Sequence, residues 1–129
     1  MKIFNNMLSS IINASNLRKK RIDIKVNKLC IKILKKLRKL NYIDFFKIYH
    51  LKNQPMACVN LRYIKSISVI SKIKVLSISS NVKHYRYKDI CGINNIYPFL
   101  GILLTSRGIL THIECLKKKT GGIFLFLIL

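Results

Sequence analysis

Acidic residues are scarce in this chain of 129 residues, where four Asp and Glu face 25 Lys and Arg. The formal net charge is therefore +21, and a chain with this imbalance repels itself unless a polyanion is bound. Hydrophobic residues still make up 50% of the sequence, which argues against a disordered basic tail. The composition predicts a compact folded protein with a cationic surface.

Long apolar runs are also missing, and so are the spacings of cysteine-based metal sites. No segment approaches the roughly 20 apolar residues of a membrane helix, and the start MKIFNNMLSS lacks the apolar stretch of a signal peptide. We therefore expect no membrane partner and no removable targeting sequence. The cysteines stand singly, so buried or half-buried free thiols in a reducing compartment are favoured over metal ligands or disulfides. They are Cys30, Cys58, Cys91 and Cys115.

The side chains that catalysis needs are few and lie far apart in the sequence. A histidine could meet Cys30 or Ser106 in space, but ordinary surface or half-buried histidines are the favoured interpretation. We expect no enzyme, and hence no catalytic residues and no small-molecule substrate. The acids and histidines considered are Asp23, Asp44, Asp89, Glu114, His50, His84 and His112.

Hydrophobic periodicity predicts the elements of the first half of the chain. Apolar residues at helical spacing favour a helix over residues 4–16, and a second helix over residues 28–40 has an apolar face opposite a lysine face. Alternation predicts a strand at residues 21–26. Two further strands, at residues 42–51 and 57–64, flank an expected loop, KNQPM.

The second half is richer in strand patterns. Residues 66–79 and the apolar run at 96–104 are each expected to form a strand, and IFLFLIL forms the last one. Thr111, followed three residues later by Glu114, has the form of a capping box and predicts a short helix.

These elements define an α+β fold with two lobes. We expect an N-terminal α-β-α-β-β lobe over residues 1–78, packed against a C-terminal lobe over residues 79–129 that is mostly β with one short helix.

Basic groups interleaved with aromatic residues are the clearest functional signal. The segment KHYRYK alternates cations and rings, so Lys83, Tyr85 and Arg86 are candidates for phosphate contacts and base stacking. Alone, such a patch could equally be a solvated face. The net charge favours nucleic acid for all the basic patches. A membrane-surface role is the alternative for the helix at residues 28–40, but the flanking strands need its apolar face as a lid.

Residues 105–108, TSRG, interrupt an apolar neighbourhood. Thr105 and Ser106 offer hydroxyls, Arg107 a permanently charged fork, and Gly108 conformational freedom, which together suit the wide minor groove of an RNA helix. From these residues alone, a plain type I or II turn with a solvent-facing arginine is favoured over RNA contact.

The segment LTSRGILTHIECLKKKTGG resembles the signature of the small-subunit ribosomal protein S-eight family, which reads Ser-Thr-Ser-Lys/Arg-Gly, two apolar residues, Thr-Asp-x-x-Ala and later Gly-Gly-Glu. MLSSIINA, Lys28-Leu29, NYID and NVKHY resemble further family motifs in the same order. The ungapped match passes through Thr105, Ser106, Arg107, Gly108, Thr111, Gly121 and Gly122.

The chain departs from the family pattern at a few positions. Leu104 replaces the leading Ser, His112 the Asp, and Ile123 the Glu after the paired glycines. Leu104 removes a hydroxyl from the loop and Ile123 a carboxylate that could brace it.

The resemblance implies a structural protein of the small ribosomal subunit. Such proteins bind a helix in the central domain of small-subunit rRNA and join early in subunit assembly beside other small-subunit proteins. It further implies that the C-terminal lobe is the rRNA-binding part, with residues 105–108 as the main contact loop, that Asn13 and Lys28 lie on a secondary surface, and that no metal or cofactor is needed. The alternative is a free-standing basic RNA-binding or regulatory protein outside the ribosome.

Composition also bears on location. Ile, Lys and Asn dominate the sequence and Trp is absent, as A+T-rich codons would produce. Together with the diverged motifs, this favours an organelle-encoded copy, mitochondrial rather than plastid, with the cytoplasm of an A+T-rich bacterium as the alternative.

Overall fold

The computed structural model describes residues 2–70, 72–77, 81–93 and 99–128. The chain divides into two compact units, Met1–Ser71 and Lys72–Leu129. Helices and strands occur in both units, which confirms the expected α+β class. No helix in the described ranges has the length and apolarity to cross a bilayer.

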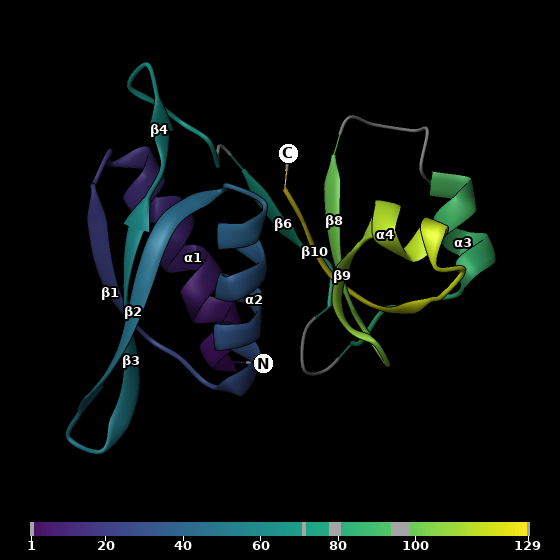
Figure 1. Cartoon of the computed structure of the whole chain (residues 1–129), viewed down its shortest axis with the longest axis horizontal. Coiled ribbons are helices and arrows are strands. Elements are labelled where there is room, and N and C mark those ends of the chain that lie inside the picture. Colours follow the sequence, from purple (N-terminus) through teal and green to yellow (C-terminus); the bar gives the residue numbers. More distant parts are fainter. Residues whose placement is uncertain (1, 71, 78–80, 94–98, 129) are drawn as a thin grey trace. The chain divides into compact units, whose positions relative to one another are not determined.

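The first unit is built on a three-stranded antiparallel sheet, with its strands in the order β1-β3-β2. Figure 1 shows α1 and α2 together on one face of it, and both helices contact the sheet and each other. The order helix, strand, helix, strand, strand is as the periodicity predicts. The helices and the strands of this sheet are α1 (Lys2–Asn16), β1 (Arg21–Lys25), α2 (Lys28–Lys39), β2 (Ile43–Leu51) and β3 (Gln54–Leu61).

The core of the first unit lies between the helices and the sheet. Ile11 of α1, Ile33 and Leu37 of α2 and Val59 of β3 are fully buried there. The Asn27 side chain caps α2 by accepting the Cys30 N–H at 2.9 Å.

The expected loop at residues 52–56 is shorter than the sequence suggests. Only Lys52 and Asn53, with φ of 51° and 62°, form the β2–β3 turn, and Gln54 is already in β3. Pro55 fits into β3 because it lies beyond the last residue pair with β1, Lys25 and Met56.

The expected strand over residues 66–79 is wrong where the structure describes it. Ile67–Ser68 (β5) folds back on Tyr63–Ile64 (β4) as a hairpin within the first unit. Ile73–Val75 (β6) already belongs to the second unit and pairs with another strand of that unit. Positive φ values at Lys65 and Ser66 make the hairpin turn. Residues 71, 78 and 79 of this expected strand lie outside the described residues.

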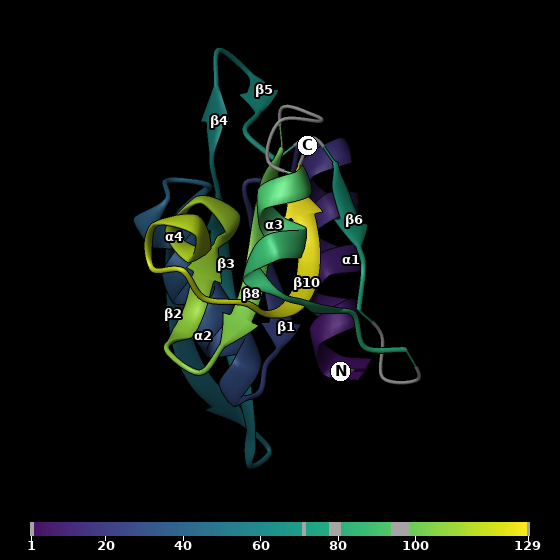
Figure 2. The same cartoon turned by 90° about the vertical axis from the view of Figure 1, so that its right-hand side faces the viewer.

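The second unit is a sheet in the order β6-β10-β8-β9, with β7 also paired to β10. Figure 2 shows β10 running beside β8, which agrees with their antiparallel register. Its core gathers around the fully buried Phe124 of β10 and Leu103 of β8. Besides β6, its elements are β7 (His84–Tyr85), α3 (Tyr87–Ile93), β8 (Leu100–Thr105), β9 (Gly108–Thr111), α4 (His112–Lys117) and β10 (Gly122–Ile128).

Among its described residues, the second unit has two short helices where one was expected. The additional helix, α3, begins where the Arg86 N–H donates to the Asp89 carboxylate at 2.9 Å. Ile90 points into the core, so the next residue, Cys91, faces solvent. The expectation of buried or half-buried thiols therefore fails at Cys91, while the other three cysteines meet it. Residues 96–98 of the strand expected at 96–104 lie outside the described residues.

Candidate RNA-binding site

The β8–β9 turn, residues 105–108, connects two antiparallel strands of the second unit. Thr105 pairs with Gly108, and Ser106 and Arg107 form the tip, where both side chains are exposed. Gly108 has a φ of +102°, a conformation that side-chain-bearing residues rarely adopt. The sequence expectation of a turn is therefore met, and its tip presents a hydroxyl and a guanidinium outward.

Thr105 has a different role in the turn from its neighbours. Its side chain is largely buried, and its hydroxyl donates to the Gly108 carbonyl at 2.9 Å and accepts the Arg107 N–H at 3.1 Å. The Thr105 hydroxyl thus holds the backbone of the turn, and Ser106 and Arg107 are the side chains free to meet a ligand.

The far end of the same hairpin is fixed by the capping box. The Thr111 hydroxyl accepts the Glu114 N–H at 3.2 Å, and the Glu114 carboxylate accepts the Thr111 N–H at 3.4 Å. α4 therefore begins directly after β9, as the sequence predicts.

Two glycines at the start of β10 bring the candidate segments together. A Cβ on Gly122 would collide with the Leu104 carbonyl oxygen and lie 2.9 Å from Thr105 Cγ2. A Cβ on Gly121 would collide with the Tyr85 carbonyl oxygen and lie 3.0 Å from the Arg86 Cα. The start of β10 is therefore in contact with the base of the β8–β9 turn and with the β7 segment at once.

The three candidate residues of the β7 segment, residues 83–86, differ in their exposure. Lys83 and Arg86 are exposed, and the Lys83 backbone is fixed because its carbonyl accepts the Phe124 N–H at 2.8 Å. The Tyr85 ring is half-buried and meets Phe124 edge to face, with ring centroids 5.1 Å apart. Lys83 and Arg86 are available for phosphate contacts, while the Tyr85 ring belongs partly to the core.

Sequence reasoning missed the buried Ser77, which holds this segment in place. The Ser77 hydroxyl accepts the Lys83 N–H at 3.0 Å and donates to the Phe124 carbonyl at 2.5 Å. The sequence feature that could have indicated Ser77 is its position as a serine within an apolar stretch.

The acidic residues of the second unit are used at helix starts and not against its exposed basic side chains. Asp89 and Glu114 are the only acidic side chains between residues 72 and 129, and both are engaged in helix starts. The exposed cations of this unit therefore remain available to external anions.

His112, which stands where the family pattern has Asp, is buried rather than exposed. Its Nδ1 accepts the Gly101 N–H at 3.0 Å, and its ring stacks on Phe99 with centroids 4.6 Å apart. Burial lowers the pKa of His112 below its usual value. His112 thus joins α4 to β8 as a neutral acceptor.

Leu104 and Ile123, the other two departures from the family pattern, face each other. They are direct partners in the β8–β10 register, and both are half-buried. The turn is therefore braced at its base by an apolar cross-strand pair.

The two N-terminal candidates lie in the first unit and on different elements. Asn13 is exposed on α1 and lines a pocket of about 460 Å³ against β1, together with Lys19, Arg21 and Asp23. Lys28 is the exposed first residue of α2 and is not among the residues lining this pocket. The two candidates thus belong to two different helices of the unit.

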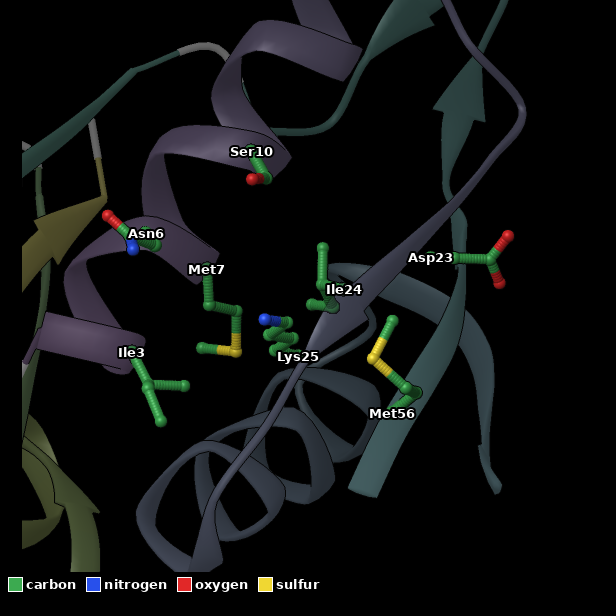
Figure 3. A pocket seen from close by; sticks show the side chains of 8 residues that line it. All are labelled: Ile3, Asn6, Met7, Ser10, Asp23, Ile24, Lys25 and Met56. Atoms are coloured by element: carbon green, nitrogen blue, oxygen red, sulfur yellow. The ribbon is translucent and has the colours of Figure 1, made fainter. Parts of the chain in front are cut away.

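A neighbouring pocket of about 330 Å³ continues along α1 and β1. Figure 3 shows Lys25 reaching toward Met7 on α1, while the Asp23 carboxylate points away from the helix. Its described lining contains one acid and one lysine, and neither histidine nor cysteine. In the part of the chain that the structure describes, no three His, Cys, Asp or Glu side chains gather to hold a metal ion.

Known proteins resemble this chain over nearly its whole length. The family model for ribosomal protein S8 matches residues 2–129. Small ribosomal subunit protein uS8 of Thermodesulfovibrio yellowstonii is 34% identical over 120 residues, covering 91% of this chain and 89% of that protein. The protein uS8m of Acanthamoeba castellanii is 33% identical over 124 residues, covering 95% and 94%, and uS8 of Borrelia duttonii is 30% identical over 118 residues, covering 91% and 89%.

The chain is thus a small-subunit ribosomal protein, structural rather than enzymatic. It belongs to the ribosomal protein S8 family, as the resemblance of its motifs predicted.

The close approach at Gly122 makes a first prediction. Gly122→Ala should destabilise the protein by about 1–3 kcal/mol, because the new Cβ meets backbone that cannot move aside. Urea unfolding measures the loss. Gly92→Ala is the matched control, since a Cβ there meets nothing within 4 Å and alanine favours the helix. Equal stability of both variants would contradict the tight contact.

Burial of His112 makes a second prediction. Since its pKa is lowered in the folded state, the unfolded chain binds the proton more readily, and stability is greatest above the ordinary histidine pKa of about 6.5. The free energy of unfolding should fall as the pH drops below that value. His112→Asn keeps an acceptor without titrating, so its unfolding free energy should depend less on pH between 7.5 and 5. An unchanged pH dependence would contradict the role of His112.

Proposed function

We propose that this chain binds a helical segment in the central domain of small-subunit rRNA and supports assembly of the subunit. The observation that carries the proposal is the β8–β9 turn, which presents Ser106 and Arg107 on a backbone held by Thr105 and Gly108. A hydroxyl and a guanidinium on a rigid turn suit the 2′-hydroxyls and phosphates along the shallow minor groove of RNA. rRNA and neighbouring small-subunit proteins are therefore its proposed partners.

Lys83 and Arg86 extend this surface. Both side chains are exposed, and their segment contacts the same start of β10 as the turn does. As cations on a fixed backbone they position the protein by phosphate contacts, while the half-buried Tyr85 ring lies at the border of the core. Asn13 and Lys28 are proposed as a secondary contact from the first unit.

Arg107→Ala tests the turn directly. If Arg107 contacts one phosphate, the dependence of log affinity on log salt concentration should become shallower by about 0.9. If it reads a base edge, the loss should be about 1–3 kcal/mol and selective for the cognate helix. Filter binding to the isolated central-domain helix, across a salt series, separates the two.

Two further variants make this test specific. Arg107→Lys retains the charge but not the planar fork, so it should restore a phosphate contact and not a bidentate one. Lys74→Ala removes an exposed cation on β6 and should leave affinity nearly unchanged. Unaltered binding by Arg107→Ala would show that the turn faces away from the RNA.

We further propose that the ribosome in question is mitochondrial. The A+T-like composition and the uS8m relative at 33% identity support this location, and the alternative is the cytoplasm of an A+T-rich bacterium. In density gradients of lysed mitochondria, the protein should co-sediment with the small subunit. Recovery only in free or membrane fractions would contradict the ribosomal role, and recovery with ribosomes outside the organelle would contradict the location alone.

A further inference from the structure

The outer edge of β1 is an open strand edge. In the part of the chain that the structure describes, β1 pairs only with β3. At the two ends of this ladder, the Leu61 N–H donates to the Lys20 carbonyl at 2.9 Å and the Val26 N–H donates to the Pro55 carbonyl at 3.2 Å. The even-numbered residues of this stretch therefore bond to β3, because hydrogen-bonded pairs alternate along an antiparallel ladder.

The odd-numbered residues of β1 consequently point their backbone groups away from the sheet. Arg21, Asp23 and Lys25 each offer one N–H and one C=O along about 14 Å of edge, and no described residue bonds to these groups. Phosphates can only accept hydrogen bonds, whereas another extended polypeptide brings N–H and C=O groups in the matching alternation. The edge therefore fits a polypeptide strand better than a nucleic-acid backbone.

A groove between α1 and β1 lies beside this edge. Two adjoining pockets, of about 330 and 460 Å³, share Ser10 of α1 and Asp23 and Ile24 of β1 as lining residues. Figure 3 shows Lys25 reaching toward α1 across the first of them, with the Asp23 carboxylate turned away from the helix. The groove thus follows β1 along its length and leaves room on the helix side for the side chains of an added strand.

Exposed apolar side chains line this groove. Ile3 lines the first pocket and is 39% exposed, and Leu17 lines the second and is 69% exposed. Ile22 lines the second pocket from β1 and is half-buried. Side chains alternate between the two faces of a strand, so every second side chain of an added strand would cover these apolar groups.

The charges along the edge select an acidic partner. Arg21 and Lys25 are exposed and lie two residues on either side of Asp23, so all three share one face of β1. Antiparallel pairing of two copies of β1 about Asp23 would place Arg21 opposite Lys25 twice and Asp23 opposite Asp23. Like charges directly opposite each other are destabilising, which disfavours a second copy of this chain as the occupant.

We propose that the edge of β1 takes up an extended acidic segment of another polypeptide as a fourth strand of the sheet. Acidic side chains of this segment stand opposite Arg21 and Lys25, and a neutral polar one stands opposite Asp23. Apolar side chains stand opposite Ile22 and Ile24, on the side of α1. Glu-Val-Ser-Val-Glu is a sequence of this pattern. The inference concerns a protein partner and does not depend on rRNA binding.

Binding of a labelled peptide to the full chain tests the proposal. The probe contains Glu-Val-Ser-Val-Glu, and the control peptide has the same composition in the order Glu-Glu-Ser-Val-Val. Fluorescence anisotropy should show the alternating peptide binding about tenfold more tightly or better, because only its order matches both faces of the edge. Equal affinities would overturn the proposal, since net charge alone would then account for binding.

Two substitutions at Asp23 separate strand addition from a side-chain effect. Asp23→Pro removes an outward N–H and leaves the β1–β3 ladder intact, because Asp23 does not bond to β3. Peptide affinity should fall about tenfold or more in Asp23→Pro and should not fall in Asp23→Ala, which keeps the N–H. Circular dichroism checks both folds. Equal affinities of the two folded variants would contradict pairing along this edge.

Charge reversal decides the matter if the proline variant does not fold. Arg21→Glu combined with Lys25→Glu should weaken binding of the acidic peptide about tenfold and should strengthen binding of Lys-Val-Ser-Val-Lys. Lys52→Glu combined with Lys65→Glu makes the same change of net charge at exposed positions elsewhere, and it should leave both affinities nearly unchanged. The same response from both double variants would overturn the proposal.

Amide hydrogen exchange identifies the occupant of the edge. Exchange at the N–H groups of Arg21, Asp23 and Lys25 should slow when the acidic peptide is bound. Slowing by central-domain rRNA and not by the peptide would overturn the proposal in favour of a nucleic acid. That result would leave RNA binding by the β8–β9 turn unaffected, so the two proposals fail separately.

Discussion

The second unit depends on the contact between the start of β10 and the backbones on either side of it. Gly121 and Gly122 have no side chains, and for this reason β10 approaches the Tyr85 and Leu104 carbonyls. Ile123 then pairs with His84 on one side and with Leu104 on the other. One short stretch of backbone thus supports both segments proposed to meet RNA.

The same contact determines how the core is filled. Phe124, two residues after Gly122, is fully buried and lies so close to Gly101 that a Cβ at that position would overlap its ring. The Gly101 N–H donates to His112, which stacks on Phe99. The glycine contacts, the Phe124 ring and the start of α4 are therefore one connected set, and rigidity at the β8–β9 turn follows from packing in the interior.

Local signals predicted the parts of this fold that local interactions form. The helical spacing of α1 and α2, the alternation in β1 and the Thr111–Glu114 capping box all act within a few residues, and each was predicted. Residues 66–79 were misread because their apolar residues resemble a single strand. β5 and β6 have different partners, β4 and β10, and this choice is made by tertiary contacts.

The sequence indicated which residues belong to the candidate site, but not what each of them does. The motif indicated residues 105–108 without separating Thr105, which holds the turn, from Ser106 and Arg107, which face outward. α3 was missed because its seven residues carry little helical periodicity, and the Asp89 contact that starts it depends on the approach of β7 to β10. Gly101 could have been noticed, since a glycine inside an apolar strand often marks a close approach.

Leu104 and Ile123, two departures from the family pattern, occupy one place in the sheet. Along the sequence they are separate departures from the family pattern, and each removes a polar support from the turn. In the sheet they are cross-strand neighbours and both are half-buried, so two aliphatic side chains stand opposite each other at the base of the turn. A single polar replacement would have left a half-buried polar group opposite an aliphatic one, which is costly unless water satisfies it. Replacing both keeps the base of the turn braced, while the groups that face a ligand, Ser106 and Arg107, are retained.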